Sequence, residues 1–224
     1  MDVLEALKTR ISCRAFLPDP VPQETIEKLL EHARFAPSGG NLQPWQVFIL
    51  GGTALEALIG DVLGKIKDTP RGEKPAYMIY PENLGEPYRA RRYKCGEDLY
   101  AAINVARDDK PGRLRQFRRN FEMFGAPVGM FLYLDKTMGP PQWSDAGMFL
   151  QSFMLAARGE GLHTCPQESW SMWSETVRSH TQAPQDLMLF CGISVGYMDV
   201  SAPVNKVRTE RAEVNEFSEF KGFE

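Results

Sequence analysis

The sequence predicts a fold of mixed helices and strands, and three observations support this. Apolar residues recur at helical spacing in several segments, most clearly over residues 53–66 and 145–159. Three apolar runs have the length of buried strands, at residues 45–50, 127–134 and 187–195. No Gly-x-Gly-x-x-Gly motif is present, so a doubly wound dinucleotide-binding fold has no support.

Length and composition limit the classes of protein to consider. A chain of 224 residues without repeats suits one domain or two small ones, and a net charge of −3 gives no general attraction to nucleic acid or acidic membranes. The four cysteines form no Cys-x-x-Cys motif, and the three histidines lack metal-ligand spacing. No signal peptide and no apolar run of roughly 20 residues occurs. We therefore expect a cytoplasmic protein without a metal site or a membrane span.

Helix-start and helix-end signals predict three helices in the N-terminal half of the chain. A short apolar stripe covers residues 3–11, and a second helix begins near Pro22 and must end before Pro37. The capping-box pattern Thr53-x-x-Glu56 predicts the start of a third helix. Residues 69–87 contain four prolines, which predicts a long irregular loop.

Signals of the same kind predict the helices and strands of the C-terminal half. A helix over residues 88–107 and another ending at Gly125 are expected to turn their apolar side chains inward: Leu99, Tyr100, Ile103, Leu114, Phe117, Phe121 and Phe124. Gly139-Pro140-Pro141 predicts a break before the helix at 145–159. Residues 161–164 predict a short strand, followed by an irregular polar segment at 165–170.

The loop at residues 36–45 has an unusual composition, Ala-Pro-Ser-Gly-Gly-Asn-Leu-Gln-Pro-Trp. Prolines restrict the backbone near both ends, and adjacent glycines allow conformations that other residues avoid. Ser38, Asn41 and Gln43 supply short polar groups where a flat ligand can approach the backbone. By itself this pattern also fits an ordinary polar turn.

Basic residues alternate near the two ends of the chain. In an extended segment Arg10, Ser12 and Arg14 share one face, which suits a phosphate or another anion. Lys206 and Arg208 alternate in the same way. Solvated basic stripes are the alternative interpretation. With the loop at 36–45 and the polar turn after Pro166, these cations predict a pocket for a flat, phosphorylated ligand. No combination of nucleophile, base and acid predicts a catalytic side chain.

Five segments in this order resemble the FMN-dependent nitroreductase family over essentially the whole chain. They are Arg10-x-Ser12-x-Arg14-x-Phe16, the loop at 36–45, Gly125-Ala126-Pro127, residues 161–170, and Gly196-Tyr197-x-Asp199 followed by Pro203-x-Asn205-Lys206-x-Arg208. The middle of the chain is most similar to the branch that acts on nitrobenzoates and nitrophenols.

The resemblance implies an α+β fold, with a central, mainly antiparallel sheet flanked by helices, built as an intertwined homodimer. It implies one nitroreductase-like domain over residues 1–224, whose C-terminal tail wraps the partner subunit. That tail is charged but carries four apolar side chains, Val214, Phe217, Phe220 and Phe223. FMN would lie at the subunit interface.

The implied FMN-binding residues come from three parts of the chain. Arg10, Ser12 and Arg208 would hold the phosphate, and Arg14 and Lys206 would lie toward the ribityl chain and the N1–O2 edge. A second group would reach FMN from the partner subunit: Pro37, Ser38, Gly39 and Asn41. A third follows the strand at 161–164 and would face the flavin N5: Pro166, Glu168 and Ser169. The family often has glycine at the position of Ser169.

The resemblance also implies the reaction. NADH or NADPH reduces FMN and leaves, and a nitroaromatic compound is then reduced in two-electron steps to nitroso and hydroxylamine products. The cofactor carries this chemistry, so no side chain need act as acid or base. Two alternatives stay open, a flavin-fragmenting or reductively dehalogenating enzyme on the same fold and a non-enzymatic flavin-binding protein. Dehalogenating relatives usually have Thr-Glu-Pro-Trp where this chain has Leu42-Gln43-Pro44-Trp45, which argues against dehalogenation.

Overall fold

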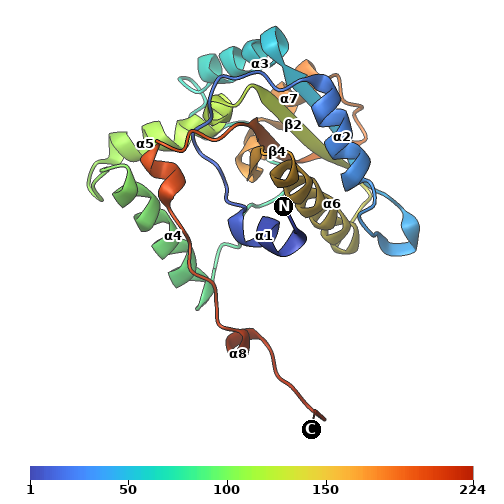
Figure 1. Ribbon diagram of the computed structural model, residues 1–224. Helices are drawn as coiled ribbons and strands as arrows, with labels where there is room; N and C mark the ends of the chain where they lie inside the picture. Colours follow the sequence, from blue (N-terminus) through green and yellow to red (C-terminus); the bar gives the residue numbers. More distant parts are fainter. Residues whose placement is uncertain (224) are drawn as a thin grey trace.

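A four-stranded sheet forms the centre of the computed structural model, which describes residues 1–223 (Figure 1). Its spatial order is β1-β2-β4-β3, and every neighbouring pair is antiparallel. The strands are β1 (Gln46–Gly51), β2 (Val128–Asp135), β3 (His163–Gln167) and β4 (Leu187–Gly196). The predicted α+β class with an antiparallel sheet is confirmed.

Helices cover both faces of this sheet. The α-helices are α1 (Val3–Thr9), α2 (Gln23–Ala33), α3 (Gly52–Lys65), α4 (Tyr88–Ala102), α5 (Lys110–Arg118), α6 (Pro140–Gly159), α7 (Ser174–Thr181) and α8 (Val214–Phe217). Short 3₁₀ turns are η1 (Gly39–Asn41), η2 (Arg119–Gly125), η3 (Glu168–Trp173) and η4 (Pro203–Lys206). None of the helices within residues 1–223 combines the length and apolar character that a bilayer span needs.

The core has two halves, one on each face of the sheet. On β2, Phe131 and Tyr133 pack into the half that includes side chains of α3, η2, η3 and α7. The intervening Leu132 and Leu134 pack into the half that α2 and α6 cover. Successive strand residues point to opposite faces, so a strand with helices on both sides is apolar throughout. This explains why 127–134 reads as one continuous apolar run.

Three predicted boundaries were wrong for identifiable reasons. Pro140 and Pro141 do not break the chain but form the first turn of α6, where a missing N–H costs no hydrogen bond. Helix α3 begins at Gly52 without the predicted side-chain cap at Thr53, because the chain passes directly from β1 into the helix. Strand β3 continues through Gln167, since β4 provides ladder partners for residues that look irregular in sequence.

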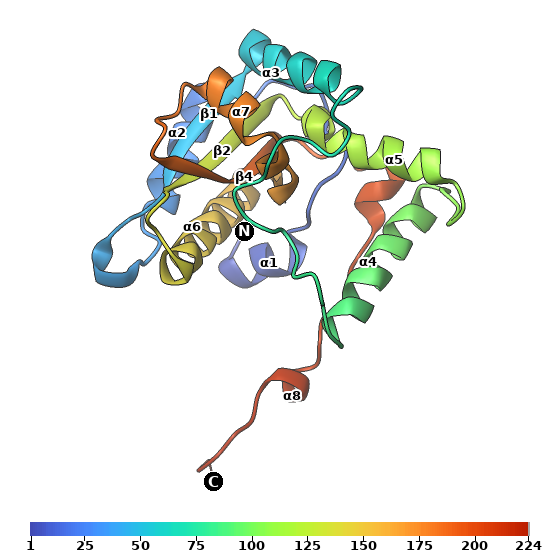
Figure 2. The ribbon, with the colours of Figure 1, turned by 180° about the vertical axis from the view of Figure 1, so that it is seen from behind.

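Helices α4 and α5 form a hairpin that projects from one side of the sheet (Figure 2). No residue of α4 is buried, and Leu114 and Phe117 on α5 are exposed. The predicted inward packing is therefore wrong for these two side chains, because the hairpin extends past the sheet that would cover them. Phe121 and Phe124, which follow in η2, are buried as predicted.

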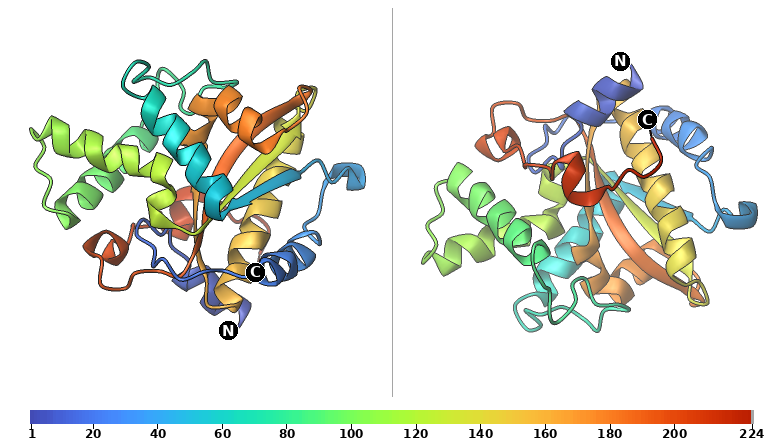
Figure 3. Two further views of the ribbon diagram at one scale, coloured as in Figure 1. Left: turned by 90° about the horizontal axis from the view of Figure 1, so that it is seen from above. Right: turned by 90° about the horizontal axis from the view of Figure 1, so that it is seen from below.

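The segments near the two chain ends lie side by side (Figure 3). Ser12 pairs with Thr164 of β3, and Phe16 pairs with Met198 just after β4. Backbone hydrogen bonds join Leu17 N–H to the Tyr197 carbonyl at 2.8 Å and Asp199 N–H to the Ala15 carbonyl at 3.1 Å. Basic residues that are far apart in sequence are thereby brought to one place.

Candidate functional site

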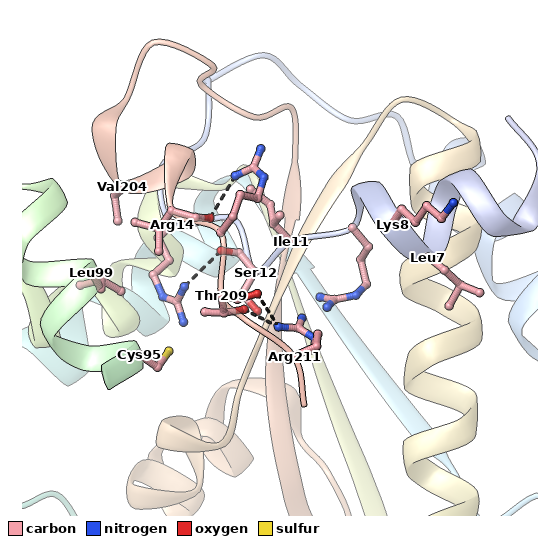
Figure 4. A pocket seen from close by; sticks show the side chains of 13 residues that line it. Leu7, Lys8, Ile11, Ser12, Arg14, Cys95, Leu99, Val204, Thr209 and Arg211 are labelled. Carbon is pink, nitrogen blue, oxygen red and sulfur yellow. Dashed lines mark hydrogen bonds between the residues drawn. The ribbon is translucent and has the colours of Figure 1, made fainter. Parts of the chain in front are cut away.

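A cavity of about 470 Å³ opens where the two terminal segments meet (Figure 4). Its walls come from α1, the segment after α1, helix α4, and η4 with the segment that follows it. The lining residues are Leu7, Lys8, Arg10, Ile11, Ser12, Arg14, Cys95, Leu99, Val204, Val207, Arg208, Thr209 and Arg211.

Every charged side chain that lines this cavity is positive. The lining includes five cationic side chains, Lys8, Arg10, Arg14, Arg208 and Arg211, and no aspartate or glutamate. Within residues 1–223 none of the five forms an ion pair, and the neighbouring Glu210 is paired with Lys94 at 3.4 Å. The chain therefore concentrates positive charge without neutralising it, which is the electrostatic character of an anion-binding site.

Buried Asn205 holds the two terminal segments in register. Its side-chain oxygen accepts from the Arg14 backbone N–H at 2.8 Å, and its amide donates to the carbonyls of Ala15 at 2.8 Å and Asp199 at 2.9 Å. The Arg208 guanidinium donates to the Asn205 carbonyl at 2.8 Å. One residue thus contacts both cations, Arg14 through its side chain and Arg208 through its backbone carbonyl, a role that no sequence pattern indicated.

Arg10 is in a crowded electrostatic environment. Burial, and after it the positive charge of Arg211, lower the pKa of this half-buried guanidinium from its ordinary value. The Arg14 guanidinium donates to the Ser12 backbone carbonyl at 3.3 Å, which holds it beside Ser12. Since guanidinium groups stay protonated in proteins, an anion with several acceptor oxygens would relieve this crowding.

Pro166, Glu168 and Ser169 lie at the end of β3 and in η3, and none of the three lines the basic cavity. Burial raises the pKa of the adjacent Cys165 thiol to about 11, and the charges of Arg14 and Arg10 act against that rise. The arginines are therefore close to this end of β3. A buried thiol with a raised pKa is a poor nucleophile. The Ser169 hydroxyl oxygen is buried and has no hydrogen-bond partner within the described chain.

Gln167 anchors this segment, and the sequence analysis missed it. Its side-chain oxygen accepts from Ser194 Oγ at 2.6 Å, and its amide nitrogen donates to the Asn120 carbonyl at 2.7 Å. The side chain is fully buried between β4 and η2. A polar residue at an inward strand position is the available sequence signal, but the hydrogen-bond partners become visible only in three dimensions.

The predicted loop residues Pro37, Ser38, Gly39 and Asn41 do not line this cavity. The loop lies beside α6, away from α4 (Figure 1). Gly39 N–H donates to both carboxylate oxygens of Asp145 at 3.3 Å, which fixes the loop on α6.

The loop turns at Gly40, and Lys206 lies on a separate element, η4. Of the two adjacent glycines only Gly40 has a positive φ, of 58°, which glycine adopts without strain, and Asn41 after it has a positive φ of 56°. Lys206 is exposed on η4 and also lies outside the lining. One chain therefore brings together Arg10, Ser12, Arg14 and Arg208, and leaves the loop residues and Lys206 apart from them.

Comparison with known proteins identifies the family. Residues 7–197 match the sequence model of the Nitroreductase family. The chain belongs to the nitroreductase family. This confirms the family that the five sequence segments indicated.

Members of this family with curated names match nearly the whole chain. Chloronitrobenzene nitroreductase of Comamonas testosteroni is 37% identical over 216 residues, covering 96% of this chain and 95% of its own. 4-nitrobenzoate reductase of Pseudomonas putida is also 37% identical over 216 residues, covering 96% and 94%. The crystal structure of FMN and NADPH-dependent nitroreductase NfnB from Sphigopyxis sp. strain HMH superposes with a TM-score of 0.97, at 44% identity and full coverage of both chains.

Proposed function

We propose that this nitroreductase-family chain is an FMN-dependent enzyme that uses NADH or NADPH to reduce nitroaromatic compounds. The reaction is a ping-pong, two-electron transfer that gives nitroso and hydroxylamine products. The observation that carries the proposal is the cavity lined by five cations and no carboxylate. The names of the relatives, which include a chloronitrobenzene nitroreductase and an FMN and NADPH-dependent enzyme, support the substrate class and the cofactors.

The residues of the cavity fit the phosphate of FMN. A phosphomonoester carries close to two negative charges and three strong acceptor oxygens, which matches several guanidinium groups and a hydroxyl. Arg10, Ser12 and Arg208 would hold this phosphate. Pro166, Glu168 and Ser169 would face the ring system attached to that phosphate, and the Ser169 hydroxyl, which has no partner in the described chain, supports this role.

FMN supplies the hydride and electron transfer when it is bound. The chain's own contribution is binding, orientation and electrostatics. Arg14 and Lys206 would lie toward the N1–O2 edge, where a cation stabilises the negative charge that two-electron reduction leaves. No side chain is assigned as a general acid or base. The segments that bind FMN would instead leave one face of its ring system open to both substrates.

A homodimer would complete the site. Pro37, Ser38, Gly39 and Asn41 lie away from the cavity of their own chain, which supports a role toward the FMN of a second copy. The tail exposes apolar side chains, and Phe217 and Phe220 are each 70% exposed. Such surface is costly in water, which supports a tail that wraps the partner subunit. In this proposal residues 1–224 are one domain, and the tail belongs to the dimer interface.

The alternatives are weaker on specific grounds. Leu42 and Gln43 stand where dehalogenating relatives usually have threonine and glutamate. A non-enzymatic flavin carrier does not explain why relatives over 96% of the chain are named as nitroreductases.

The four cysteines, all of them free thiols in the described chain, support a reducing, cytoplasmic location.

Steady-state kinetics test the function directly. The purified yellow protein should oxidise NADH or NADPH only after a nitrobenzoate or nitrophenol is added, with parallel double-reciprocal plots and little superoxide under air. Intersecting plots or abundant superoxide would overturn the two-electron ping-pong mechanism. Halide release from a halogenated phenol, without nitro reduction, would favour the dehalogenase alternative.

A further inference from the structure

We infer that the phosphate site extends into the C-terminal segment, with Arg211 as an additional phosphate ligand that ties the start of the tail to the bound cofactor. This inference rests on the proposed function, and it concerns a residue outside the segments that carry the family resemblance. The ligand that Arg211 would bind is a phosphomonoester. Binding of the cofactor would then be coupled to the position of the tail.

Arg211 is held in position before any ligand binds. Its Nη1 donates to Thr209 Oγ1 at 2.6 Å and to the carbonyls of Thr209 and Glu210, each at 3.0 Å. Within residues 1–223 no hydrogen bond engages its Nη2 or Nε atoms. A guanidinium fixed on one side, with free donors on the other, loses less entropy when it binds an anion than a mobile side chain does.

The free donors of Arg211 belong to the cavity that Arg10 and Arg14 line. In Figure 4 the side chains of Arg14 and Arg211 enter the same hollow, with Ser12 and Thr209 between them. Arg211 is close enough to Arg10 for its charge to contribute to the lowered pKa of that residue. Like charges that face one cavity are stabilised by an anion between them, and a phosphate can accept from both.

No carboxylate of the described chain takes this role. The adjacent Glu210 is directed to Lys94 at 3.4 Å, and Glu216, further along the tail, pairs with Arg91 at 3.1 Å. Both pairs are solvent-exposed and join the tail to α4 weakly. A phosphate bound by Arg211 would hold the segment that leads to α8 more firmly than these pairs do.

Two ligands that differ only in the phosphate test the assignment. The dissociation constants of FMN and riboflavin are measured by flavin fluorescence with full-length apoprotein prepared from the holoenzyme. Arg211→Gln should weaken FMN binding about tenfold, within the range expected for a lost charged hydrogen bond, and leave riboflavin binding unchanged. Lys221→Gln, a cation of the same tail that pairs with Glu219, is the matched control and should change neither constant.

Parallel variants separate the failure of this inference from the failure of the proposed function. If Arg10→Gln and Arg208→Gln weaken FMN binding but Arg211→Gln does not, Arg211 is not a ligand and the proposed site stands. If none of the three changes FMN binding, the cavity does not hold the phosphate, and the site and the inference both fail. Equal weakening of FMN and riboflavin by Arg211→Gln would assign the arginine to folding or to a partner contact and overturn the inference.

Hydrogen exchange tests the link to the tail. Amide exchange over residues 209–217 should be slower with FMN than with riboflavin in the wild-type protein, because only FMN reaches Arg211 with a phosphate. The difference should disappear in Arg211→Gln. Equal protection by the two ligands in the wild-type protein would overturn the link.

Discussion

Gly192 on β4 lies directly against the indole ring of Trp170 on η3. A methyl group added to Gly192 would come within 2.4 Å of Trp170 Cδ1 and 2.8 Å of its Cγ. Trp170 is fully buried and packs edge-to-face with Phe121 and Phe131, at centroid distances of 5.6 and 5.4 Å. The missing side chain of Gly192 therefore lets η3, which carries Glu168 and Ser169, pack closely onto the sheet.

Gly192→Ala should lower the free energy of unfolding by about 1–3 kcal/mol, because the overlap with a buried indole forces side chains out of their preferred rotamers. Urea unfolding measures the change. Gly60→Ala is the matched control, since a Cβ there meets nothing within 4 Å. In the exposed interior of α3 that change should stabilise by roughly 0.5–1 kcal/mol. Equal effects at the two positions would contradict the packing argument.

Asn205→Ala should destabilise the protein by about 2–4 kcal/mol, since it removes three hydrogen bonds worth about 1 kcal/mol each and leaves buried partners unpaired. It should also weaken FMN binding, because the side-chain oxygen that holds the Arg14 backbone is lost, whereas the backbone carbonyl that accepts from Arg208 remains. Asn215→Ala, on the exposed helix α8, should change neither quantity. Unfolding curves and FMN titrations of both variants measure the two quantities. An Asn205→Ala protein with wild-type stability would refute the anchoring role.

Acid should destabilise the protein through His163. Burial, followed by the charges of Arg158 and Arg208, lowers the pKa of His163 to about 4. The unfolded chain has the ordinary histidine pKa of about 6.5 and so binds the proton more readily. The stability contributed by the neutral imidazole is complete above about pH 6.5 and is lost as the pH falls toward 4.

His163→Gln removes the titrating group and should flatten the stability profile between those two pH values. The midpoint of urea unfolding of the cofactor-free protein, where Arg208 keeps its full charge, measures the profile. His32→Gln is the control, since His32 is exposed on α2 and its loss should leave the acid limb unchanged. An identical acid limb in wild-type and His163→Gln proteins would exclude His163 as the source.

The exposed tail predicts a sedimentation difference. Replacing Phe217 and Phe220 by serine removes apolar surface that is 70% exposed in the single chain. If this surface packs on a second copy, the double variant should shift toward monomer at micromolar concentration, whereas Lys221→Gln should sediment as the wild type does. A wild-type protein that is monomeric, active and loaded with FMN would rule out the dimer proposal.

The candidate site was only partly predictable from sequence. Arg10, Ser12 and Arg14 were found because alternation in an extended segment is a local pattern. Arg211 was missed because it falls outside the alternation of Lys206 and Arg208, although it lies only three residues after Arg208. Asn205 and Gln167 were missed as anchors because their partners lie far along the chain, at a separation of 191 residues for Asn205 and Arg14.

The sequence by itself determined the class of fold, the strands and most of the helices, whereas α7 and α8 were not predicted. The predicted helices are encoded by a local period of apolar residues, and β2 and most of β4 form continuous apolar runs because helices cover both faces of the sheet. Only the tertiary structure decided which cations share a cavity, and that Leu114 and Phe117 stay exposed. Periodicity specifies which face of an element is apolar, but whether another element reaches that face depends on how distant segments pack.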